Sequence, residues 1–372
     1  MKCKLSDICS FRKGKIETKE LNEKNYISTE NMIPNKQGIT NASSLPKVRT
    51  VNEFKKGDVL VSNIRPYFKK IWIAEYDGGC SNDILVFKAN KGINNYFLYY
   101  LISDDAFFEY ATVTAKGTKM PRGDKSSIMS FEVPDFDMGK QLKIASILKS
   151  IDDKIKINNK INNNLENQAV SIYNKLCIDN NSLKYKRGIL SDIADITMGQ
   201  SPKGSSYNKN GIGTIFFQGK AEFGDRFPQV RLYTTEPKKI ACINDTLISV
   251  RAPVGELNIA HTDCCIGRGL AAIRSKSKQQ SFIHYTMCHL KKELDIFNAN
   301  GTVFGSINKI SLNNMPIIIP PDEIIEQFEK IISPIDSIIR NNYNENCILK
   351  YIKEFLLSKL ISGELDISNI NI

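Results

Sequence analysis

Hydrophobic residues recur at alternating steps of four and three over two long stretches of the chain. Such heptad spacing is typical of paired helices. A helix of about 36 residues, at 1.5 Å per residue, would form a rod of about 54 Å. The second seam follows the first at an offset of 184, from 328 to 360. The first seam comprises positions 144, 148, 151, 155, 158, 162, 165, 169, 172 and 176.

Two Asn residues lie near the middle of each seam. If the helices run antiparallel with residue numbers that sum to 504, Asn158 opposes Asn346 and Asn162 opposes Asn342. The same register sets Leu148 against Leu356 and brings other apolar residues together. An Asn at a buried seam position needs a polar partner and can thereby fix the register. We therefore predict an intramolecular antiparallel coiled coil whose register is set by these four Asn, although a chain rich in Asn could place them there by chance.

The stretches between the seams read as strand-rich. Short β-branched or aromatic runs at residues 59–64, 71–74 and 84–87 are bounded by Gly, Asp and Asn, which is typical of strands. Residues 96–102 and 282–287 are counterparts that predict one helix in each half. The pattern therefore indicates mixed, strand-rich globular parts.

Fragments of the first half recur in the second half at offsets between 184 and 187. The tetrapeptide at 5–8 returns at 190–193, and the strand-like run at 58–62 returns at 245–249. Matches in register over a whole unit indicate a tandem duplication. We predict an α+β fold in which two strand-rich mixed domains are separated by two long helices that form the antiparallel coiled coil. The predicted boundaries are 1–137 for the first domain, 138–178 for the first helix, 188–320 for the second domain and 321–362 for the second helix.

Charge narrows the choice of partner. The 372 residues include 51 Lys and Arg against 40 Asp and Glu, a net charge of +11. Residues 1–140 and 188–321 carry +5 each, whereas the helical segments 141–187 and 322–372 carry +5 and −4. Two equally basic globular parts point to a polyanion, and nucleic acid is the leading candidate.

The remaining composition restricts the class of protein. Hydrophobic residues make up 41% of the chain, which excludes a wholly disordered protein. No apolar run reaches the roughly 18–20 residues of a membrane span, and the N-terminus has no signal-peptide pattern, so we expect a cytoplasmic protein without a membrane partner. The nine Cys have no Cys-x-x-Cys spacing, so neither a disulfide framework nor a regular zinc site is indicated.

Candidate catalytic motifs are weak. Asp135 after a Pro, with Asp152 and Lys154 further on, formally spells a nuclease signature, but Asp152 and Lys154 flank the heptad seam and chance explains the match better. The glycine loop at 199–204 lacks the Lys of a phosphate-binding loop. The pair Cys264 and Cys265 is a poor zinc motif, because adjacent Cys rarely bind one ion together. We expect no catalytic residues, no metal and no cofactor.

Two alternatives remain open from the residues alone. One is a self-sufficient DNA-modifying enzyme, either a methyltransferase or a nuclease that uses Asp135, Asp152 and Lys154. The other is a tandem-repeat scaffold with no role in nucleic-acid binding, which absent or salt-insensitive DNA binding would favour.

Duplicated globular domains that alternate with two long helices resemble the specificity (S) subunit of type I restriction–modification systems. The likeness covers nearly the full chain, although Asn244 replaces the usual Gly before Asp245. It implies a non-catalytic subunit in which each domain reads one half of a bipartite target in double-stranded DNA. The helices would set the spacing and dock two methylation subunits, and restriction subunits would complete the enzyme. The motifs that carry the resemblance lie at 25–31, 57–66, 117–121, 133–141, 216–220, 244–249, 319–327 and 360–364.

Polar and basic residues in Gly-punctuated loops are the candidates for DNA contact. Arg, Gln and Asn can bind base edges bidentately, whereas Lys more often binds phosphate, and any single Lys can equally be a solvated surface charge. The predicted DNA-binding residues are Ser28, Thr29, Asn31, Arg65, Tyr67, Lys69, Lys119, Arg122, Lys125, Gln218, Lys220, Arg226, Arg251, Thr302 and Lys309.

Overall fold

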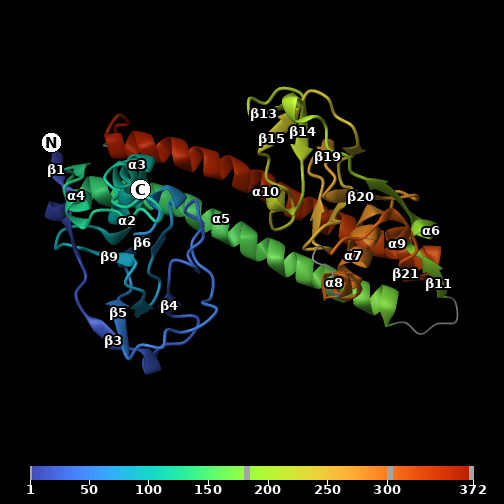
Figure 1. The fold of residues 1–372 in the computed structure, drawn as a ribbon, viewed down its shortest axis with the longest axis horizontal. Helices are drawn as coiled ribbons and strands as arrows, with labels where there is room; N and C mark the ends of the chain where they lie inside the picture. Colours follow the sequence, from blue (N-terminus) through green and yellow to red (C-terminus); the bar gives the residue numbers. More distant parts are fainter. Residues whose placement is uncertain (1, 180–184, 300–304, 368–372) are drawn as a thin grey trace. The chain divides into compact units, whose positions relative to one another are not determined.

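The computed structural model describes residues 2–179, 185–299 and 305–367, and its elements are labelled in Figure 1. The chain forms two compact units. Unit 1 comprises Met1–Asn158 with Asn344–Ile372, and unit 2 comprises Asn159–Tyr343. The long helices α5 (Met138–Tyr173) and α10 (Asp322–Ser362) each contribute residues to both units.

Unit 1 is built mainly from short strands. Its helical elements outside α5 and α10 are α1 (Leu5–Ile8), η1 (Thr18–Glu20), η2 (Pro66–Phe68), α2 (Asn95–Ser103), α3 (Asp105–Val113) and α4 (Lys125–Met129). Its strands are β1 (Lys2–Lys4), β2 (Cys9–Phe11), β3 (Lys15–Glu17), β4 (Tyr26–Ile27), β5 (Thr50–Phe54), β6 (Val59–Ser62), β7 (Ile71–Ile73), β8 (Gly78–Cys80), β9 (Ile84–Ala89) and β10 (Glu132–Pro134).

Unit 2 repeats this plan. Its helical elements outside α5 and α10 are η3 (Asn174–Ile178), α6 (Leu190–Ile193), η4 (Gly204–Ser206), η5 (Lys220–Glu222), α7 (Gln280–His289), α8 (Lys291–Ala299) and α9 (Lys309–Asn313). Its strands are β11 (Lys186–Ile189), β12 (Ala194–Met198), β13 (Tyr207–Asn208), β14 (Thr214–Phe217), β15 (Leu232–Thr234), β16 (Ile240–Ala241), β17 (Thr246–Ser249), β18 (Leu257–Ile259), β19 (Cys264–Ile266), β20 (Leu270–Ser275) and β21 (Pro316–Ile319).

The sheets of the two units correspond. The antiparallel order β2-β9-β6-β7 in unit 1 matches β12-β20-β17-β18 in unit 2. A second sheet follows the order β3-β5-β8-β4 in unit 1 and β13-β15-β14-β19-β16 in unit 2, and each contains one parallel pair, β4 with β8 or β14 with β19. The structure thus confirms the predicted duplication of a strand-rich α+β domain.

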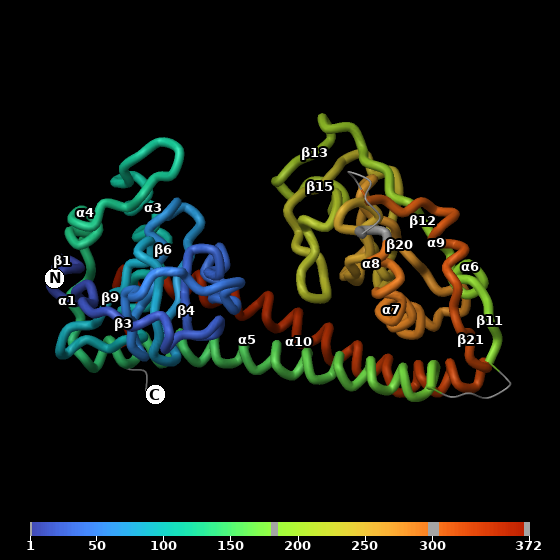
Figure 2. The backbone as a smooth tube through the Cα atoms, turned by 60° about the horizontal axis from the view of Figure 1, so that its bottom comes forward, coloured from blue at the N-terminus to red at the C-terminus, as the bar shows by residue number. Residues whose placement is uncertain are grey.

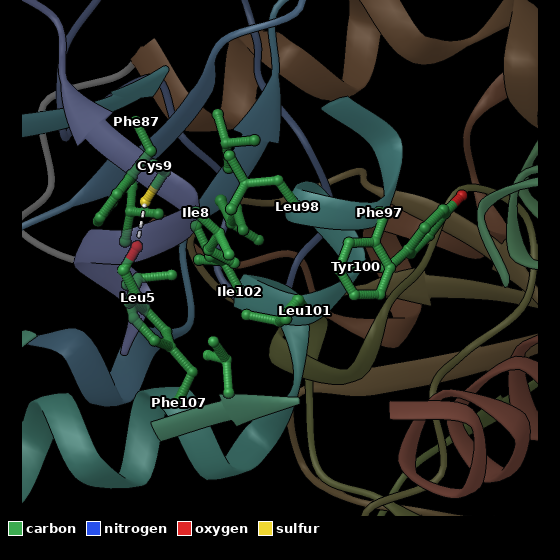
Figure 3. Packing of buried hydrophobic residues seen from close by; sticks show 14 of the residues in the cluster. Leu5, Ile8, Cys9, Phe87, Phe97, Leu98, Tyr100, Leu101, Ile102 and Phe107 are labelled. Atoms are coloured by element: carbon green, nitrogen blue, oxygen red, sulfur yellow. Dashed lines mark hydrogen bonds between the residues drawn. The ribbon is translucent and has the colours of Figure 1, made fainter. Parts of the chain in front are cut away.

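The main core of unit 1 packs the first sheet against α2, α3 and the long helices. Phe87 of β9, Phe107 of α3 and Leu98 of α2 are fully buried in it (Figure 3). Fully burying one such side chain contributes about 1.5–3 kcal/mol, so this cluster is a major source of the stability of unit 1. The predicted strands at 59–64, 71–74 and 84–87 are found as β6, β7 and β9, and the two predicted helices as α2 and α7.

Each unit buries one carboxylate that binds a guanidinium side-on. In unit 1, Asp58 accepts hydrogen bonds from Nε and Nη2 of Arg12, which follows β2. In unit 2, Asp245 occupies the equivalent position but accepts from Nε and Nη2 of Arg274 on β20, both at 2.8 Å. The two halves therefore pair equivalent carboxylates with Arg residues from different places in the sheet.

The long helices run antiparallel within each unit. In unit 1, Asn158 Nδ2 donates to Asn346 Oδ1 at 2.9 Å, and both side chains are buried. In unit 2, Asn342 Nδ2 donates to Asn162 Oδ1 at 2.8 Å. Both pairs have residue numbers that sum to 504, so the antiparallel coiled coil expected from the heptad pattern is confirmed.

No helix in the described part of the chain is long and apolar enough to cross a membrane.

We expect the double replacement of Asn158 and Asn346 by Leu to loosen the helix register, because two apolar residues can pack in several registers whereas an Asn pair favours one. The measurement is disulfide trapping between Cys introduced at 155 and 349, which face each other in this register, in a background with Ser at 347. The cross-linked fraction should fall, and cross-links from 155 to positions one heptad away should appear. Unchanged cross-linking in the double variant would exclude a register role. The single Asn158→Leu variant is the control, because it removes the amide that donates to buried Asn346 Oδ1 and should cost about 1–3 kcal/mol.

Candidate nucleic-acid interface

An aromatic turn projects from the first sheet of unit 1, between β6 and β7. Tyr67 and Phe68 of η2 are 47% and 38% exposed, and their ring centroids lie 4.8 Å apart. Arg65 and Lys69 flank them, both in the left-handed region with φ of 50°. Such backbone conformations are costly for residues other than Gly and concentrate at functional sites. The turn therefore presents two aromatic faces between two basic residues.

A second strained segment holds this turn in place. Asn35 and Lys36 are also left-handed, and their backbone N–H groups donate to the carbonyls of Phe68 and Lys69 at 2.8 and 2.9 Å. The Lys36 ammonium binds Asp105 at 2.8 Å and Glu354 of α10 at 3.2 Å, and Lys69 binds Asp105 at 2.7 Å. Burial would raise the pKa of Asp105, but the hydrogen bonds from the two Lys hold it below its usual value. The aromatic turn is thus preorganised by an ionic network.

The predicted basic loop of unit 1 lies against the same turn. Arg65 N donates to Pro121 O at 2.8 Å, and Ile64 forms a β-bridge with Arg122. Figure 2 shows the connection between α3 and α4 extending away from the sheets of unit 1. Lys119 is exposed within this connection, and Lys125 is exposed at the first residue of α4. Arg65, Tyr67, Lys69 and Arg122 are therefore brought together, with Lys119 and Lys125 on the adjoining loop and helix.

Unit 2 has the same framework with different side chains. Arg251 lies in the segment after β17, as Arg65 lies in the segment after β6. It forms a β-bridge with Ser306, as Ile64 does with Arg122, and Ser306 precedes Lys309 at the start of α9. Arg251 and Lys309 are exposed. The segment after Arg251 is Ala252-Pro253, with a cis peptide bond, in place of the aromatic pair. The two units therefore present equivalent positions with different chemistry.

The other predicted polar residues follow the parallel strands. Ser28 and Thr29 come after β4 and are half-buried, whereas Gln218 comes after β14 and is exposed. Thr29 O accepts a hydrogen bond from Lys70 at 2.6 Å. Lys220 is exposed and lies 3.5 Å from Glu256, in the segment after Arg251. Thr302 lies outside the described residues.

Two of the predicted DNA-binding residues, Asn31 and Arg226, are buried and hold contacts within the fold. Asn31 is only 5% exposed, and its amide donates to the carbonyls of Tyr26 and Thr40, so it shapes its own loop. Arg226 is only 8% exposed and pairs with Glu166 of α5 at 2.8 Å and with Asp336 of α10. Both side chains are engaged within the fold, and their contact with DNA stays a prediction.

Arg226 borders a polar cavity of about 350 Å³ within unit 2. His284, Glu329 and Arg340 also line it. Burial, together with the charge of Arg226, lowers the pKa of His284 well below its usual value, so the imidazole is neutral at neutral pH. Burial raises the pKa of Glu329 against the effect of the hydrogen bond it accepts from Phe282 N. The cavity thus holds a neutral imidazole beside opposite charges.

The residues of the formal nuclease signature are engaged in helix contacts. Asp152 accepts hydrogen bonds from the Tyr100 hydroxyl and the Lys353 ammonium, and Lys154 binds Glu345 at 3.2 Å. Asp152 and Lys154 therefore serve contacts of the helix pair in this structure. Among the described residues, no group of three or more His, Cys, Asp or Glu is arranged to hold a metal.

Sequence reasoning missed the residues that anchor the site. Lys36 and Asp105 could not be identified from the sequence. The left-handed backbone at Asn35 and Lys36 is not marked by Gly, and the ionic partners of Lys36 lie far along the chain. Tyr100 and Tyr285 did carry a signal, since they recur 185 residues apart in the two counterpart helices.

Comparisons with known proteins agree with this duplicated architecture. A family model described as the type I restriction modification DNA specificity domain matches residues 1–167 and 184–351. A putative type I restriction enzyme MjaX specificity subunit of Methanocaldococcus jannaschii is 30% identical over 338 residues, which cover 83% of this chain and 78% of that protein. The type I restriction enzyme MjaIX specificity subunit of the same organism is 26% identical, covering 85% of this chain and 79% of that protein. The crystal structure of a type I restriction–modification system S subunit from M. genitalium shares the fold, with a TM-score of 0.60 at 16% identity over 99% of this chain and 96% of that chain.

Proposed function

The chain belongs to the type I restriction modification DNA specificity family, and from this premise we propose that it selects a bipartite sequence in double-stranded DNA. Residues 1–137 and 188–320 would each read one half-site. The helical segments 138–178 and 321–362 would hold the two domains at a set spacing. We propose further that the chain is not itself a catalyst and works in the cytoplasm with two methylation subunits and, in the full enzyme, restriction subunits.

One observation carries this proposal. The two units share one framework, down to the β-bridge that Ile64 forms in unit 1 and Arg251 forms in unit 2, yet the exposed side chains that follow differ. A duplicated frame with divergent surface loops suits two readers of two different half-sites, because base contacts depend on loop side chains while the frame supplies position. In unit 1, Tyr67 and Phe68 offer apolar contact to base edges, and Arg65 and Arg122 beside them can bind base edges or phosphates.

The test is methylome sequencing of the host with and without this gene. We expect deletion to remove one methylated motif made of two short half-sites separated by unspecified bases. Replacing residues 188–320 by the corresponding domain of a relative with another target should change only one half-site. A methylome that deletion leaves unchanged would refute the proposal. Methylation or cleavage of DNA by the purified chain alone, with magnesium and S-adenosylmethionine, would favour the self-sufficient enzyme instead.

A further inference from the structure

A buried tyrosine connects the globular part of unit 1 to both long helices. The hydroxyl of Tyr100 on α2 donates to Asp152 Oδ2 of α5 at 2.8 Å, and Tyr100 is only 1% exposed. Lys353 Nζ of α10 donates to the other oxygen of Asp152 at 2.7 Å and lies 5.8 Å from the centre of the Tyr100 ring. Figure 3 shows Tyr100 at the edge of the core, with its hydroxyl pointing away from the labelled apolar side chains.

Unit 2 contains the same arrangement. The hydroxyl of Tyr285 on α7 donates to Asp336 Oδ1 of α10 at 3.1 Å, and Tyr285 is 2% exposed. Arg226 Nη2 donates to the same carboxylate, while Nη1 donates to Glu166 of α5 at 2.8 Å. The guanidinium lies 5.8 Å from the centre of the Tyr285 ring. The cluster again connects one globular part to both helices.

The Tyr and the Asp of the two clusters occupy repeat-related positions, whereas the cation does not. Tyr100 and Tyr285 are 185 residues apart, and Asp152 and Asp336 are 184 apart, within the offsets of the repeat. The cation, by contrast, comes from the long helix in unit 1 and from the globular part in unit 2. The Tyr–Asp hydrogen bond is thus common to both halves although its supporting charge has changed source.

Core packing alone does not require this hydroxyl. The neighbouring core positions hold Phe97, Phe107 and Phe108, which bury an aromatic ring with no polar group. A buried hydroxyl must be compensated by a partner, and a hydrogen bond to a carboxylate is directional and about twice as strong as one between neutral groups. In both units the carboxylate comes from a long helix. In unit 2 the Tyr285 hydroxyl also accepts long hydrogen bonds from Arg226 of the globular part.

We propose that these two Tyr–Asp–cation clusters, which we call domain latches, set the angle of each recognition domain on the helix pair. In this role, which rests on the proposed function, the latches determine which spacing between half-sites is accepted. Tyr100 and Tyr285 are positioning residues that read no bases. The latch of unit 1 consists of Tyr100, Asp152 and Lys353, and that of unit 2 of Tyr285, Asp336, Arg226 and Glu166.

The test removes only the hydroxyls, with Tyr100→Phe and Tyr285→Phe in the full chain bound to its methylation subunits. Binding is measured on duplexes that carry the motif found by methylome sequencing, with the spacer unchanged, one base pair longer or one shorter. We expect discrimination against the wrong spacers to fall about tenfold for either variant, equivalent to about 1.4 kcal/mol. Discrimination against a base change within a half-site should stay as in the wild type.

Matched variants separate positioning from simple loss of stability. Tyr76→Phe removes a hydroxyl whose acceptor, Lys24 O, lies in the globular part of the same unit, and should leave spacer discrimination unchanged. Lys353→Arg places in unit 1 the guanidinium that unit 2 uses and should retain discrimination, whereas Lys353→Met should lose it. Wild-type spacer discrimination in both Tyr→Phe variants would overturn the latch proposal.

A readout that needs no DNA separates failure of the latch from failure of the proposed function. Backbone hydrogen exchange in the full chain should increase in α2 for Tyr100→Phe and in α7 for Tyr285→Phe, and remain unchanged for Tyr76→Phe. Increased exchange in a protein that binds no specific DNA would refute the proposed function and leave the latch as a domain attachment. Unchanged exchange together with unchanged spacer discrimination would refute the latch alone.

Discussion

Replacing Arg226 by Met is expected to destabilise unit 2 by about 3–5 kcal/mol, because it leaves Asp336 and Glu166 without their shared cation. The cost should fall at the lower end of this range, since both carboxylates keep partial access to water. The measurement is urea unfolding of the full chain, with hydrogen exchange to locate the loss in unit 2.

The control for Arg226 is Arg231→Met, which removes an exposed guanidinium from the same segment and should change stability by less than about 0.5 kcal/mol. An equal effect of the two replacements would contradict a structural role for Arg226. If Arg226 instead contacted DNA, its replacement would leave unfolding unchanged and weaken binding to all sequences alike.

Replacing Tyr67 by Ala should weaken binding to the cognate target about 10- to 100-fold, and the loss should be confined to the half-site read by unit 1. Loss of recognition at one base pair of a duplex costs about 1–3 kcal/mol, and the turn that carries Tyr67 is already ordered, so no ordering cost offsets the contact. The measurement is equilibrium binding of the complex to three duplexes, which carry the full target, a change in the first half-site or a change in the second.

Two further variants test whether the loss at Tyr67 is specific to base recognition. Val48→Ala removes another exposed apolar side chain of unit 1, 57% exposed, and should have no effect. Arg65→Ala should weaken or relax recognition at the same half-site only. Equal losses on every duplex for Tyr67 and Arg65 would mean that they hold the backbone and read no bases.

The helix pair was predictable because its signal is periodic and local. Each seam position is specified by a residue three or four places away, and the four Asn fixed the register that the hydrogen bonds of Asn158 and Asn342 confirm. The burial of Arg226 was not predictable in this way. Its partners lie 60 and 110 residues away on two different helices, and a lone Arg in a loop gives no indication of them.

The aromatic turn was predictable only in part. Arg65, Tyr67 and Lys69 were identified from their composition and their place after a strand, but not their left-handed backbone, which residues other than Gly rarely adopt. That conformation depends on Lys36 and Asp105, whose proximity to the turn is a property of the folded unit. Sequence patterns therefore indicated where the surface lies, and tertiary contacts explain why it is ordered.

Asp58 and Asp245 receive their guanidinium groups from different positions in the two halves. This difference affects which recombination events between the halves of the gene would give a folded domain. A hybrid domain that joined Arg12 of the first half to Asp245 and Arg274 of the second would bring two guanidinium groups to one carboxylate. The reciprocal hybrid would bury Asp58 with neither. A crossover inside a domain therefore carries an electrostatic penalty, whereas a crossover within the long helices keeps each pair intact. Exchange of whole domains therefore avoids the electrostatic penalty at Asp58 and Asp245.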